Sequence, residues 1–536
     1  MGFKYYDKSQ GKYVPMSIEI LKSEGVSYTA PLIKSEFDKI DFKIGNIANF
    51  KSQGDTLTEK IVNEFSERFI NPKWYGAKGD GVFDDSTALQ NTLNNKGNIY
   101  IPKGKYLVKK TLVVLENTTV LFHPEAEIIR GSQIYCIFTN GKPEDKYLSY
   151  NGNGNINLIG GTLDVKGDSI KSNGGGIVFG HSENVVIKNM LIKNIYNIHH
   201  IEINSSKNVL IDNCRFENFY HDGTRPYSEA VQIDLAKNES VFPVFGDYDG
   251  TVCDNITIQN STFNKVGAGI GTHVSAHDTW HENIKIFNNT FEDLLHHAVS
   301  GLIFRRFHIS GNEVKNCWRA FYLAWCYDGN VSNNIIKDTT DHGILIRKTN
   351  NVSINGVKIA RAGEVGISIY EGSHSIQIDN CTIDEGQNLG INIDGNTITV
   401  SNSTIKYNKN HGIYIHNSAK NNKVSFSNVY GNGRHGILIT DSSSLNRIEG
   451  NFVYANNQTN SNCNNLMVVK NANNNRVINN ICRIGDMTNK PQYGLFIEET
   501  CSNTLALMND LRQSGAALNF YDEGQNTITS TENITS

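Results

Sequence analysis

A short alternation of apolar and variable positions recurs along the chain from residue 176 almost to its end. Each copy usually begins with a small residue, which is followed by an apolar, a variable and a second apolar residue, as in Gly343-Ile-Leu-Ile. The copies begin at Gly176, His200, Ala230, Gly269, Ala298, Ala320, Gly343, Gly366, Gly390, Gly412, Gly436, Gly494 and Ala517. Their usual period of about 23 residues predicts a solenoid, because each repeat can bury its apolar side only against its neighbours.

An Asn followed by a small or apolar residue marks a second position in many of these turns. It occurs at Asn189, Asn213, Asn260, Asn289, Asn312, Asn334, Asn380, Asn402 and Asn451. One short alternating strand and one Asn-bearing bend per turn predict a parallel β-helix, in which like residues stack on successive turns. The predicted fold class is therefore all-β, with a single-stranded parallel β-helix.

The composition agrees with turn-rich β structure. Of the 536 residues, 38% are hydrophobic and only 19% are charged, and the chain has 47 Gly but 9 Pro. A chain of this length is too long for a domain with one ordinary hydrophobic core, but a solenoid can include all of it in a single rod. The net charge of −4 without a basic block disfavours a nucleic-acid partner. No apolar run is long enough for a transmembrane helix, so we expect no membrane insertion.

The nine Cys residues form no CxxC pair, and their odd number argues against a disulfide framework. Cys214 and Cys381 follow the Asn of their turns, where other turns carry Ser261 or Thr290, so we expect small, buried, free thiols. The N-terminus lacks the apolar stretch of a signal peptide. These features predict a protein that is made in a cytoplasm and released by a route other than classical secretion.

The first 70 residues carry no copy of the repeat and are expected to form a separate segment. A polar helix is predicted over residues 56–69. In it Ile61, Phe65 and Phe69 form a narrow apolar stripe, which suits a partner, a neighbouring chain or the segment's own domain.

The next stretch is expected to close the open end of the β-helix. Asp84 or Asp85 can cap a short helix that packs Ala88, Leu89 and Leu93 inward, which would cover the unpaired backbone of the first turn. Residues 98–108 are then predicted to form a hairpin-like pair of strands.

Two stretches in this region carry a resemblance to a known family. Residues 74–90 read Trp-Tyr-Gly-Ala-Lys-Gly-Asp-Gly-Val-Phe-Asp-Asp-Ser-Thr-Ala-Leu-Gln, and residues 99–106 read Ile-Tyr-Ile-Pro-Lys-Gly-Lys-Tyr. Together they resemble the opening of the pectate-lyase-like superfamily of right-handed β-helices, and the similarity extends over residues 71–530. Within that superfamily, the chain resembles the tail-spike and pre-neck appendage proteins of phages that infect Gram-positive bacteria.

The resemblance implies a pectin-lyase-like right-handed β-helix with a glycan-binding groove. It does not choose the chemistry, because the superfamily includes lyases, hydrolases, epimerases and non-catalytic adhesins. It also implies that residues 1–70 attach the protein to phage tail or baseplate proteins in the virion, and that the protein is a homotrimer.

Strand parity assigns the two faces of each repeat. The two apolar residues of a copy point into the rod, so the residue between them and the residue after them point outward. This places ionisable groups on about six consecutive turns between residues 199 and 347. The outward pairs are Glu202 and Asn204, Gln232 and Asp234, Gly271 and His273, Ser300 and Leu302, Tyr322 and Ala324, and Leu345 and Arg347.

Three of these residues, together with Glu229 at the bend before Ala230, are the predicted catalytic groups. Glu202 and Asp234 should be diagonal neighbours about 8 Å apart, a spacing that suits the two carboxyl groups of an inverting glycosidase. Glu229 lies one bend from Asp234, and His273 is expected beside Asp234 on the next turn, where each group shifts the pKa of the other. Exposed polar side chains on a solvated face are the alternative interpretation.

Two loops are expected to border this site. The interval from Ala230 to Gly269 is much longer than the usual repeat, and a long loop on one turn of a solenoid commonly walls a binding groove. Asp247 and Asp249 from this loop are predicted to reach the substrate, and Phe242, Phe245 and Tyr248 to stack on sugar rings. The predicted substrate-binding set is His297, Arg319, Tyr322, Asp247, Asp249 and Trp280.

No metal and no cofactor are predicted. His273, His277 and His281 are spaced four apart, which would align zinc ligands on a helix, but this segment leaves a strand and enters a loop. A lyase mechanism remains an alternative, because Arg319 or Arg347 could stabilise an enolate intermediate.

The resulting hypothesis is a phage tail-spike-like depolymerase that hydrolyses a host cell-surface polysaccharide at Asp234 with Glu202 or Glu229. The alternatives are a polysaccharide lyase, a teichoic-acid phosphodiesterase, a non-catalytic receptor-binding protein and a secreted pectinase, which the absent signal peptide disfavours.

Overall fold

The computed structural model describes residues 4–7, 12–15, 69–273, 278–530 and 532–536. The chain divides into two compact units, residues 1–69 and residues 70–536. In the first unit the described residues form an antiparallel pair of strands, β1 (Lys4–Asp7) and β2 (Lys12–Pro15). The helix predicted over residues 56–69 and the attachment role of residues 1–70 lie outside the described residues, apart from these strands and Phe69.

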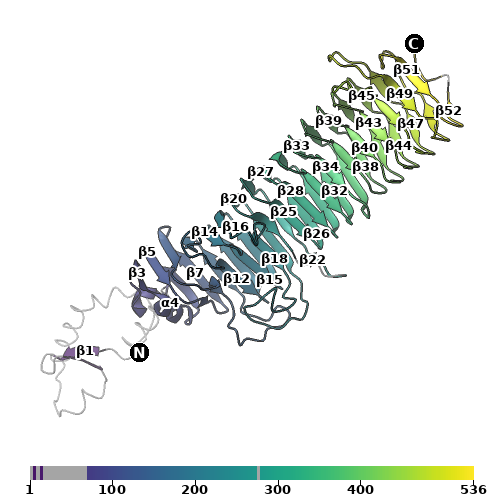
Figure 1. Cartoon of the computed structure of the whole chain (residues 1–536). Helices are drawn as coiled ribbons and strands as arrows, with labels where there is room; N and C mark the ends of the chain where they lie inside the picture. Colours follow the sequence, from purple (N-terminus) through teal and green to yellow (C-terminus); the bar gives the residue numbers. More distant parts are fainter. Residues whose placement is uncertain (1–3, 8–11, 16–68, 274–277, 531) are drawn as a thin grey trace, which may run out of the picture. The chain divides into compact units, whose positions relative to one another are not determined.

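The second unit is a parallel β-helix. Its strands repeat in the same order through three sheets, and each strand pairs in parallel with its equivalent one turn away (Figure 1). We number the sheets by the order in which three consecutive strands enter them, β4 (Gly97–Ile101), β5 (Gly104–Val108) and β6 (Leu112–Val113). Sheet 1 runs from β4 (Gly97–Ile101) to β52 (Ile528–Thr529), and sheet 2 runs from β3 (Asp80–Asp84) to β48 (Ile481–Arg483). The all-β right-handed β-helix expected from the sequence is confirmed.

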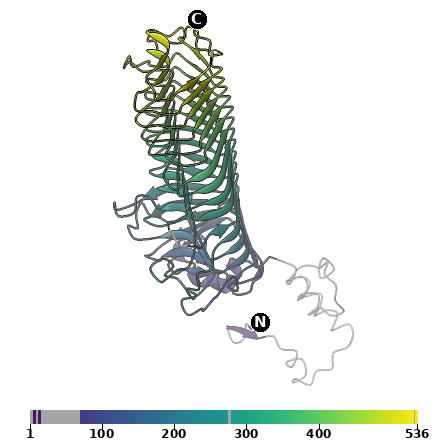
Figure 2. The same cartoon turned by 90° about the vertical axis from the view of Figure 1, so that its right-hand side faces the viewer.

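Sheet 3 contains the Gly-Ile-x-Ile copies and carries the candidate site. Its strands are β6 (Leu112–Val113), β9 (Cys136–Thr139), β12 (Gly175–Gly180), β15 (Ile201–Asn204), β18 (Glu229–Asp234), β21 (Ala268–Gly271), β25 (His297–Leu302), β28 (Arg319–Ala324), β31 (Ile344–Arg347), β34 (Ile367–Ile369), β37 (Ile391–Ile393), β40 (Ile413–Ile415), β43 (Ile437–Ile439), β46 (Leu466–Val468), β49 (Tyr493–Ile497) and β51 (Leu518–Asp522). Figure 2 shows the same stack of turns from the side.

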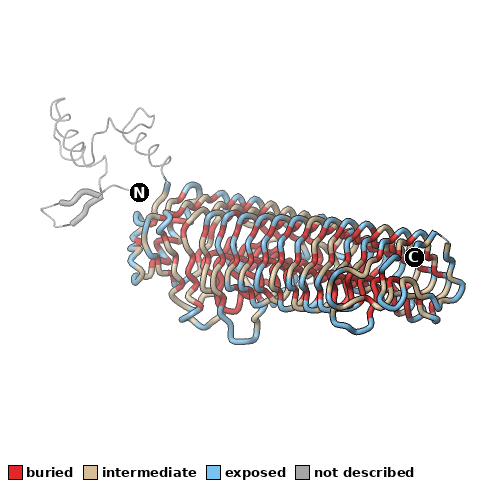
Figure 3. Tube along the Cα trace, turned by 90° about the horizontal axis from the view of Figure 1, so that it is seen from above, coloured by how far each residue is buried: buried red, intermediate tan, exposed pale blue. Residues whose placement is uncertain are grey.

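The core is a set of apolar columns that run along the axis of the β-helix. In sheet 3 the register sets Ile177, Ile201, Val231 and Ile270 on top of one another, and each of them is fully buried. Buried positions recur at the same place on successive turns, as the red segments in Figure 3 show. Strand parity therefore gave the inward face of these repeats correctly.

The N-terminal end of the β-helix is covered as expected. Helix α4 (Ser86–Leu93) buries Ala88, Leu89 and Leu93 against the first turns. The backbone N–H of Ser86 donates to Asp84. Asp85 instead accepts from the N–H groups of Lys78 and Gly79 and thereby fixes the turn before the helix.

The hairpin predicted over residues 98–108 is wrong. The strands are β4 and β5 (Gly104–Val108), but β4 pairs with β7 (Thr118–Phe122) in sheet 1, and β5 pairs with β3 and β8 (Ala126–Arg130) in sheet 2. Two adjacent strands in the sequence therefore belong to different sheets, because each turn of the β-helix bends between them.

The Asn residues that mark the turns occupy two different positions. Asn189 and Asn213 adopt a left-handed backbone at the bend, and their amides bond to each other on the outside. Asn289, Asn312 and Asn334 come one position later and are buried, with each amide accepting from the backbone of the preceding turn. Cys214 and Cys381 share this buried position, and all nine Cys residues are buried free thiols, as predicted.

Candidate functional site

The candidate site lies on the outer face of sheet 3, on the turns that contain β15, β18 and β21. The register pairs Glu202 with Gln232, Asn204 with Asp234, and Gln232 with Gly271. Glu202 and Asp234 are therefore diagonal neighbours on adjacent strands, for which strand spacing and rise give about 8 Å between backbones. This agrees with the arrangement predicted from strand parity.

Glu202 is a buried carboxyl group with few compensating contacts. Its side chain is 1% exposed, accepts a hydrogen bond from Asn204 Nδ2 at 2.9 Å and lies 3.4 Å from the hydroxyl of Tyr135. Burial raises the pKa of Glu202 to about 7, since the charged form is poorly solvated there. Glu202 therefore binds a proton more readily near neutral pH than an exposed Glu does.

Asp234 is equally buried but has a more polar environment. Its Oδ2 accepts from Gln232 Nε2 at 3.1 Å, and its Oδ1 accepts from the backbone N–H of Leu235 at 2.9 Å. Burial raises the pKa of Asp234 to about 6, while the positive charge of His273 and these hydrogen bonds limit the rise. The two carboxyl groups thus differ in pKa, with Asp234 the stronger acid.

The sequence predicted that these groups face solvent, and this is wrong for the carboxyl groups, whose residues are at most 1% exposed. The long loop between β18 and β19 (Asp254–Gln259) packs beside these groups on the same sheet. Phe242 and Phe245 of this loop are buried against Val178, which precedes Glu202 in the same outward column. Their predicted role in stacking on sugars is therefore wrong as well, because the loop folds onto the sheet.

Glu229 and His273 form an ion pair beside the two carboxyl groups. His273 Nδ1 lies 3.3 Å from Glu229 Oε2. Burial would raise the pKa of Glu229, but the hydrogen bond and charge of His273 outweigh it and lower this pKa. Burial would lower the pKa of His273, and Glu229 reverses this shift so that the pKa is raised. His273 is 36% exposed and is the member of this pair that solvent reaches.

His199 is a site residue that the sequence-based set omitted. Its Nδ1 lies 2.7 Å from the backbone oxygen of Glu229 and 3.7 Å from Glu229 Oε2, and its ring stacks on His273 with centroids 5.9 Å apart. Burial lowers the pKa of His199 to about 3, so its ring is neutral. His199 directly precedes its copy of the repeat, and Glu229 occupies the same position one turn later. The alignment of the repeats could therefore have predicted that His199 lies beside Glu229.

Two amide oxygens at the centre of the site have no hydrogen-bond partner among the described residues. Asn204 and Gln232 each donate an amide N–H to the carboxyl group on their own strand, and each leaves its oxygen buried and unpaired. An unpaired buried acceptor is costly, so these oxygens favour a ligand that brings hydroxyl donors.

Arg225 also contributes to the electrostatics of this region. It is half-buried on the connection between β17 (Arg215–Tyr220) and β18. Burial is the main cause of the low pKa of His199, and the charge of Arg225 lowers it further. Arg225 therefore brings a positive charge near the carboxyl groups, which the sequence reasoning did not identify.

Further along sheet 3, an aromatic and cationic cluster follows the carboxyl groups. His297 stacks on Tyr322 with ring centroids 5.4 Å apart, and the guanidinium of Arg319 lies 4.4 Å from the centre of the Trp318 ring. Arg319 also forms an ion pair with Asp341, whose other oxygen bonds to His342. The structure therefore brings three predicted substrate-binding residues, His297, Arg319 and Tyr322, into one group.

The other three predicted substrate-binding residues lie apart from that group. Asp249 accepts from the backbone N–H of Ser149 at 2.6 Å and so ties two loops together, while Asp247 pairs with Lys146 at 3.6 Å. Trp280 donates to the backbone oxygen of Trp325 and packs edge-to-face against Tyr327. Each of these side chains has a structural contact of its own.

The four-residue spacing of His273, His277 and His281 does not form a metal site. His281 is fully buried in β22 (His281–Glu282) of sheet 1, where its Nδ1 accepts from the backbone N–H of Cys253. His277 lies outside the described residues. The structure instead sets His273 beside His199 and Glu229, with one possible ligand atom from each residue and all three atoms within 4.8 Å of one another.

Comparison with known proteins places this geometry in a family context. Residues 69–322 match the family described as rhamnogalacturonase A/epimerase, pectate lyase-like, and residues 294–453 match the right handed beta helix region. Both matches agree with the parallel β-helix that residues 70–536 form. The first match contains the whole candidate site, and the second covers turns farther along the β-helix.

Similar proteins come from bacteria and phages. Plasmin and fibronectin-binding protein A of Streptococcus pneumoniae is 32% identical over 48% of this chain and 41% of that protein. The preneck appendage protein of Bacillus phage PZA is 24% identical over 63% of this chain and 47% of its own length. The crystal structure of PfbA, a surface adhesin of Streptococcus pneumoniae, has a TM-score of 0.50 and 25% identity over 67% of this chain and 90% of that chain. This chain thus spans less than half the length of the two curated relatives.

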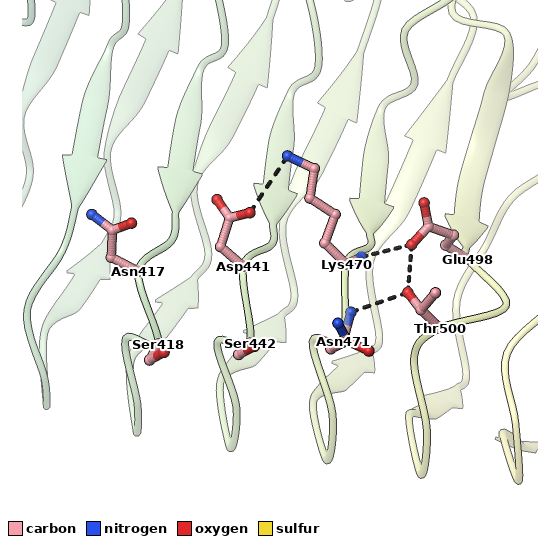
Figure 4. Close-up of a pocket in the computed structure, with 8 residues that line it drawn as sticks. All are labelled: Asn417, Ser418, Asp441, Ser442, Lys470, Asn471, Glu498 and Thr500. Carbon is pink, nitrogen blue, oxygen red and sulfur yellow. Dashed lines mark hydrogen bonds and ion pairs between the residues drawn. The ribbon is translucent and has the colours of Figure 1, made fainter.

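A hollow of about 650 Å³ lies on the C-terminal turns of this β-helix, away from the candidate site. It is lined by Asn417, Ser418, Asp441, Ser442, Lys470, Asn471, Glu498 and Thr500 (Figure 4). Several of these groups pair with one another. Lys470 forms an ion pair with Asp441 at 3.4 Å, and its backbone N–H donates to Glu498. These contacts stabilise successive turns, and we assign no chemistry to this hollow.

The described part of the chain contains no helix that is both long and apolar enough to span a membrane.

Proposed function

We propose that this protein is a phage tail-spike-like depolymerase that cleaves a host cell-surface polysaccharide by acid/base hydrolysis. The observation that carries the proposal is the pair of diagonal carboxyl groups, Glu202 and Asp234, whose pKa values are raised to about 7 and about 6. Two carboxyl groups with separated pKa values can divide the roles of acid and base near neutral pH.

In the proposed reaction Glu202 is the general acid and Asp234 is the general base. Glu202 gives its proton to the glycosidic oxygen as the bond to the anomeric carbon breaks. Asp234 takes a proton from the water that attacks this carbon, and the diagonal spacing of about 8 Å leaves room for that water. Glu202 and Asp234 exchange their protons with solvent before the next cycle.

The neighbouring residues support these roles. Glu229 raises the pKa of His273, and a positive charge on His273 lowers the pKa of Asp234 and so favours the ionised base. The unpaired oxygens of Asn204 and Gln232 can accept hydrogen bonds from sugar hydroxyls. Because Glu202 and Asp234 are covered, substrate binding has to displace part of the cover, of which Tyr135 is the residue in contact with Glu202.

The test compares binding with turnover in single variants. Wild type, Asp234→Asn and Glu202→Gln are incubated with purified capsule, exopolysaccharide and teichoic acid from a candidate host. We expect both variants to bind the polysaccharide and to lose turnover by at least about 100-fold, in line with general acid/base contributions. Glu292→Gln, on an exposed position of sheet 2, is the matched control and should keep full activity.

Other products would select another mechanism on the same surface. An unsaturated uronate would indicate a lyase, and a phosphomonoester released from teichoic acid would indicate a phosphodiesterase. Unchanged turnover in Asp234→Asn would rule out its role as the base.

A second candidate function is receptor binding without catalysis. It is favoured by the relatives, since one is a plasmin and fibronectin-binding protein, another is a phage preneck appendage protein, and a similar structure is a surface adhesin. In this case the wild-type protein binds a host-surface glycan, and no product forms with any of the three polymers. Location in the phage virion, attachment through residues 1–70 and assembly as a homotrimer belong to both candidate functions.

A further inference from the structure

His199, Glu229 and His273 meet on three consecutive turns of the β-helix. His199 precedes β15, Glu229 begins β18, and His273 follows β21. Continuing the pairing of Ile201 with Val231 by two residues sets His199 beside Glu229. The stacked turns are about 4.8 Å apart, so the ring of His199 lies one turn from the carboxylate of Glu229. His273 comes from the far end of β21, since Glu229 itself pairs with Ala268, and its ring reaches the same carboxylate.

The contacts show that both rings approach the same carboxylate oxygen. Glu229 Oε2 lies 3.3 Å from Nδ1 of His273 and 3.7 Å from Nδ1 of His199. One ring nitrogen of each His and one oxygen of Glu229 lie within 4.8 Å of one another. A single charged His would be enough to pair with Glu229, so the second ring calls for another explanation.

His199 also contacts the backbone of Glu229. Its Nδ1 lies 2.7 Å from the backbone oxygen of Glu229, a contact in which the ring donates its proton. The other nitrogen, Nε2, then keeps its lone pair. Ligating His residues usually donate their second ring N–H to a carbonyl or carboxylate oxygen in this way.

We propose that His199, Glu229 and His273 form a binding site for a divalent transition metal ion, and that Zn²⁺ is bound there. Two imidazoles and one carboxylate are a ligand set that Zn²⁺ accepts in sites that keep a fourth position open. His199 and Glu229 are 3% and 4% exposed, whereas His273 is 36% exposed. The open position would therefore lie on the solvent side, next to His273.

Zinc binding by three ligands can be measured on the full-length protein without any substrate. The protein is treated with a chelator, dialysed and titrated with ZnCl₂ at pH 7.5 by calorimetry. We expect one Zn²⁺ per chain. Titration with Co²⁺ should produce the visible absorption bands of a site with fewer than six ligands, and Zn²⁺ should abolish these bands.

Single variants assign the ligands. His199→Asn, Glu229→Gln and His273→Ala should each weaken Zn²⁺ binding by at least about 100-fold, because even loss of a supporting residue around a metal costs 10- to 100-fold. His308→Ala removes an exposed His from β26 (Phe304–Ser310) and should bind Zn²⁺ like the wild type. Circular dichroism and thermal melting in chelator confirm that each variant is folded.

The proposal is overturned if wild type binds less than one fifth of an equivalent of Zn²⁺, or if the folded triad variants bind it like His308→Ala. Because binding is scored without turnover, this result is independent of the test for hydrolysis. A protein can fail one of these tests and pass the other.

Discussion

At the scale of single residues, burial determines the chemistry of this site. Glu202 and Asp234 are diagonal neighbours on two turns, and burial raises the pKa of both, from 4.5 to about 7 for Glu202 and from 3.8 to about 6 for Asp234. Strand parity predicted these positions from the sequence. It could not predict that the carboxyl groups are buried, because distant residues such as Tyr135 contact them.

The pKa values predict a narrow pH range for hydrolysis. Asp234 has to be ionised and Glu202 protonated, so kcat/KM should be largest between about pH 6 and pH 7. The charge of His273 lowers the pKa of both groups, so His273→Ala should move both limbs of the profile to higher pH. The measurement is the pH dependence of kcat/KM for both proteins. A profile whose limbs stay in place in His273→Ala would contradict this electrostatic role.

Buried His residues predict a loss of stability in mild acid. Burial lowers the pKa of His199, His200 and His281 from 6.5 to about 3, because the folded protein disfavours the charged ring. Such a His is neutral in both the folded and the unfolded state above pH 6.5. As the pH falls from 6.5 toward 3, only the unfolded state binds a proton, so the free energy of unfolding decreases progressively. The melting temperature should therefore fall steadily from pH 6.5 to pH 4. A melting temperature that is constant over this range would contradict the assignment of neutral buried rings.

At the scale of the repeat, the buried Asn ladders connect one turn to the next. Asn312 accepts from the backbone of Asn289 and donates to Asn334 and to the backbone oxygen of Ile286. The sequence analysis identified the repeated Asn residues but treated them as one structural position. In the structure they occupy two, the left-handed bend and the buried position that follows it. Asn suits the two positions for different reasons. The bend requires a residue that tolerates a positive φ, and the buried position requires a side chain that both donates and accepts hydrogen bonds.

Replacing a buried ladder residue should cost far more stability than replacing a bend residue. Asn312→Ala leaves several buried partners unpaired, so we expect a loss of about 3 kcal/mol in the free energy of unfolding. Asn213→Ala, at the exposed bend with its φ of 53°, should cost about 1 kcal/mol through backbone strain. Urea denaturation of both variants is the measurement. Equal losses would contradict the distinction between the two positions.

At the scale of the whole molecule, exposed apolar side chains gather on the C-terminal half of the β-helix. They include Tyr407, Phe426, Phe452, Ile481 and Met508, each at least 38% exposed. Phe452 and Ile481 pair on neighbouring strands of sheet 2, exposed apolar neighbours favour an interface, and a homotrimer would cover them. Sedimentation equilibrium should then give three times the 59.7 kDa mass of the chain. A purely monomeric protein at micromolar concentration would contradict the trimer.

The fold was predictable from the sequence because the same pattern of apolar and polar positions recurs in every turn, and each turn therefore forms the same strands. The columns of Ile177, Ile201 and Val231 follow directly from the apolar alternation. The site was only partly predictable, since it depends on which side chains of different turns meet. His199 and Arg225 were missed in this way, and the hydrogen bonds that hold Asp249 in its loop were not foreseeable.

The most direct test of the proposed hydrolysis is to follow the oxygen atom of the attacking water. The protein is incubated with purified host polysaccharide in H₂¹⁸O, and the fragments are analysed by mass spectrometry. We predict one ¹⁸O atom at each new reducing end, formed by wild type and absent with Asp234→Asn. Fragments that carry an unsaturated sugar and no ¹⁸O, or labelled fragments formed equally fast by Asp234→Asn, would contradict the account.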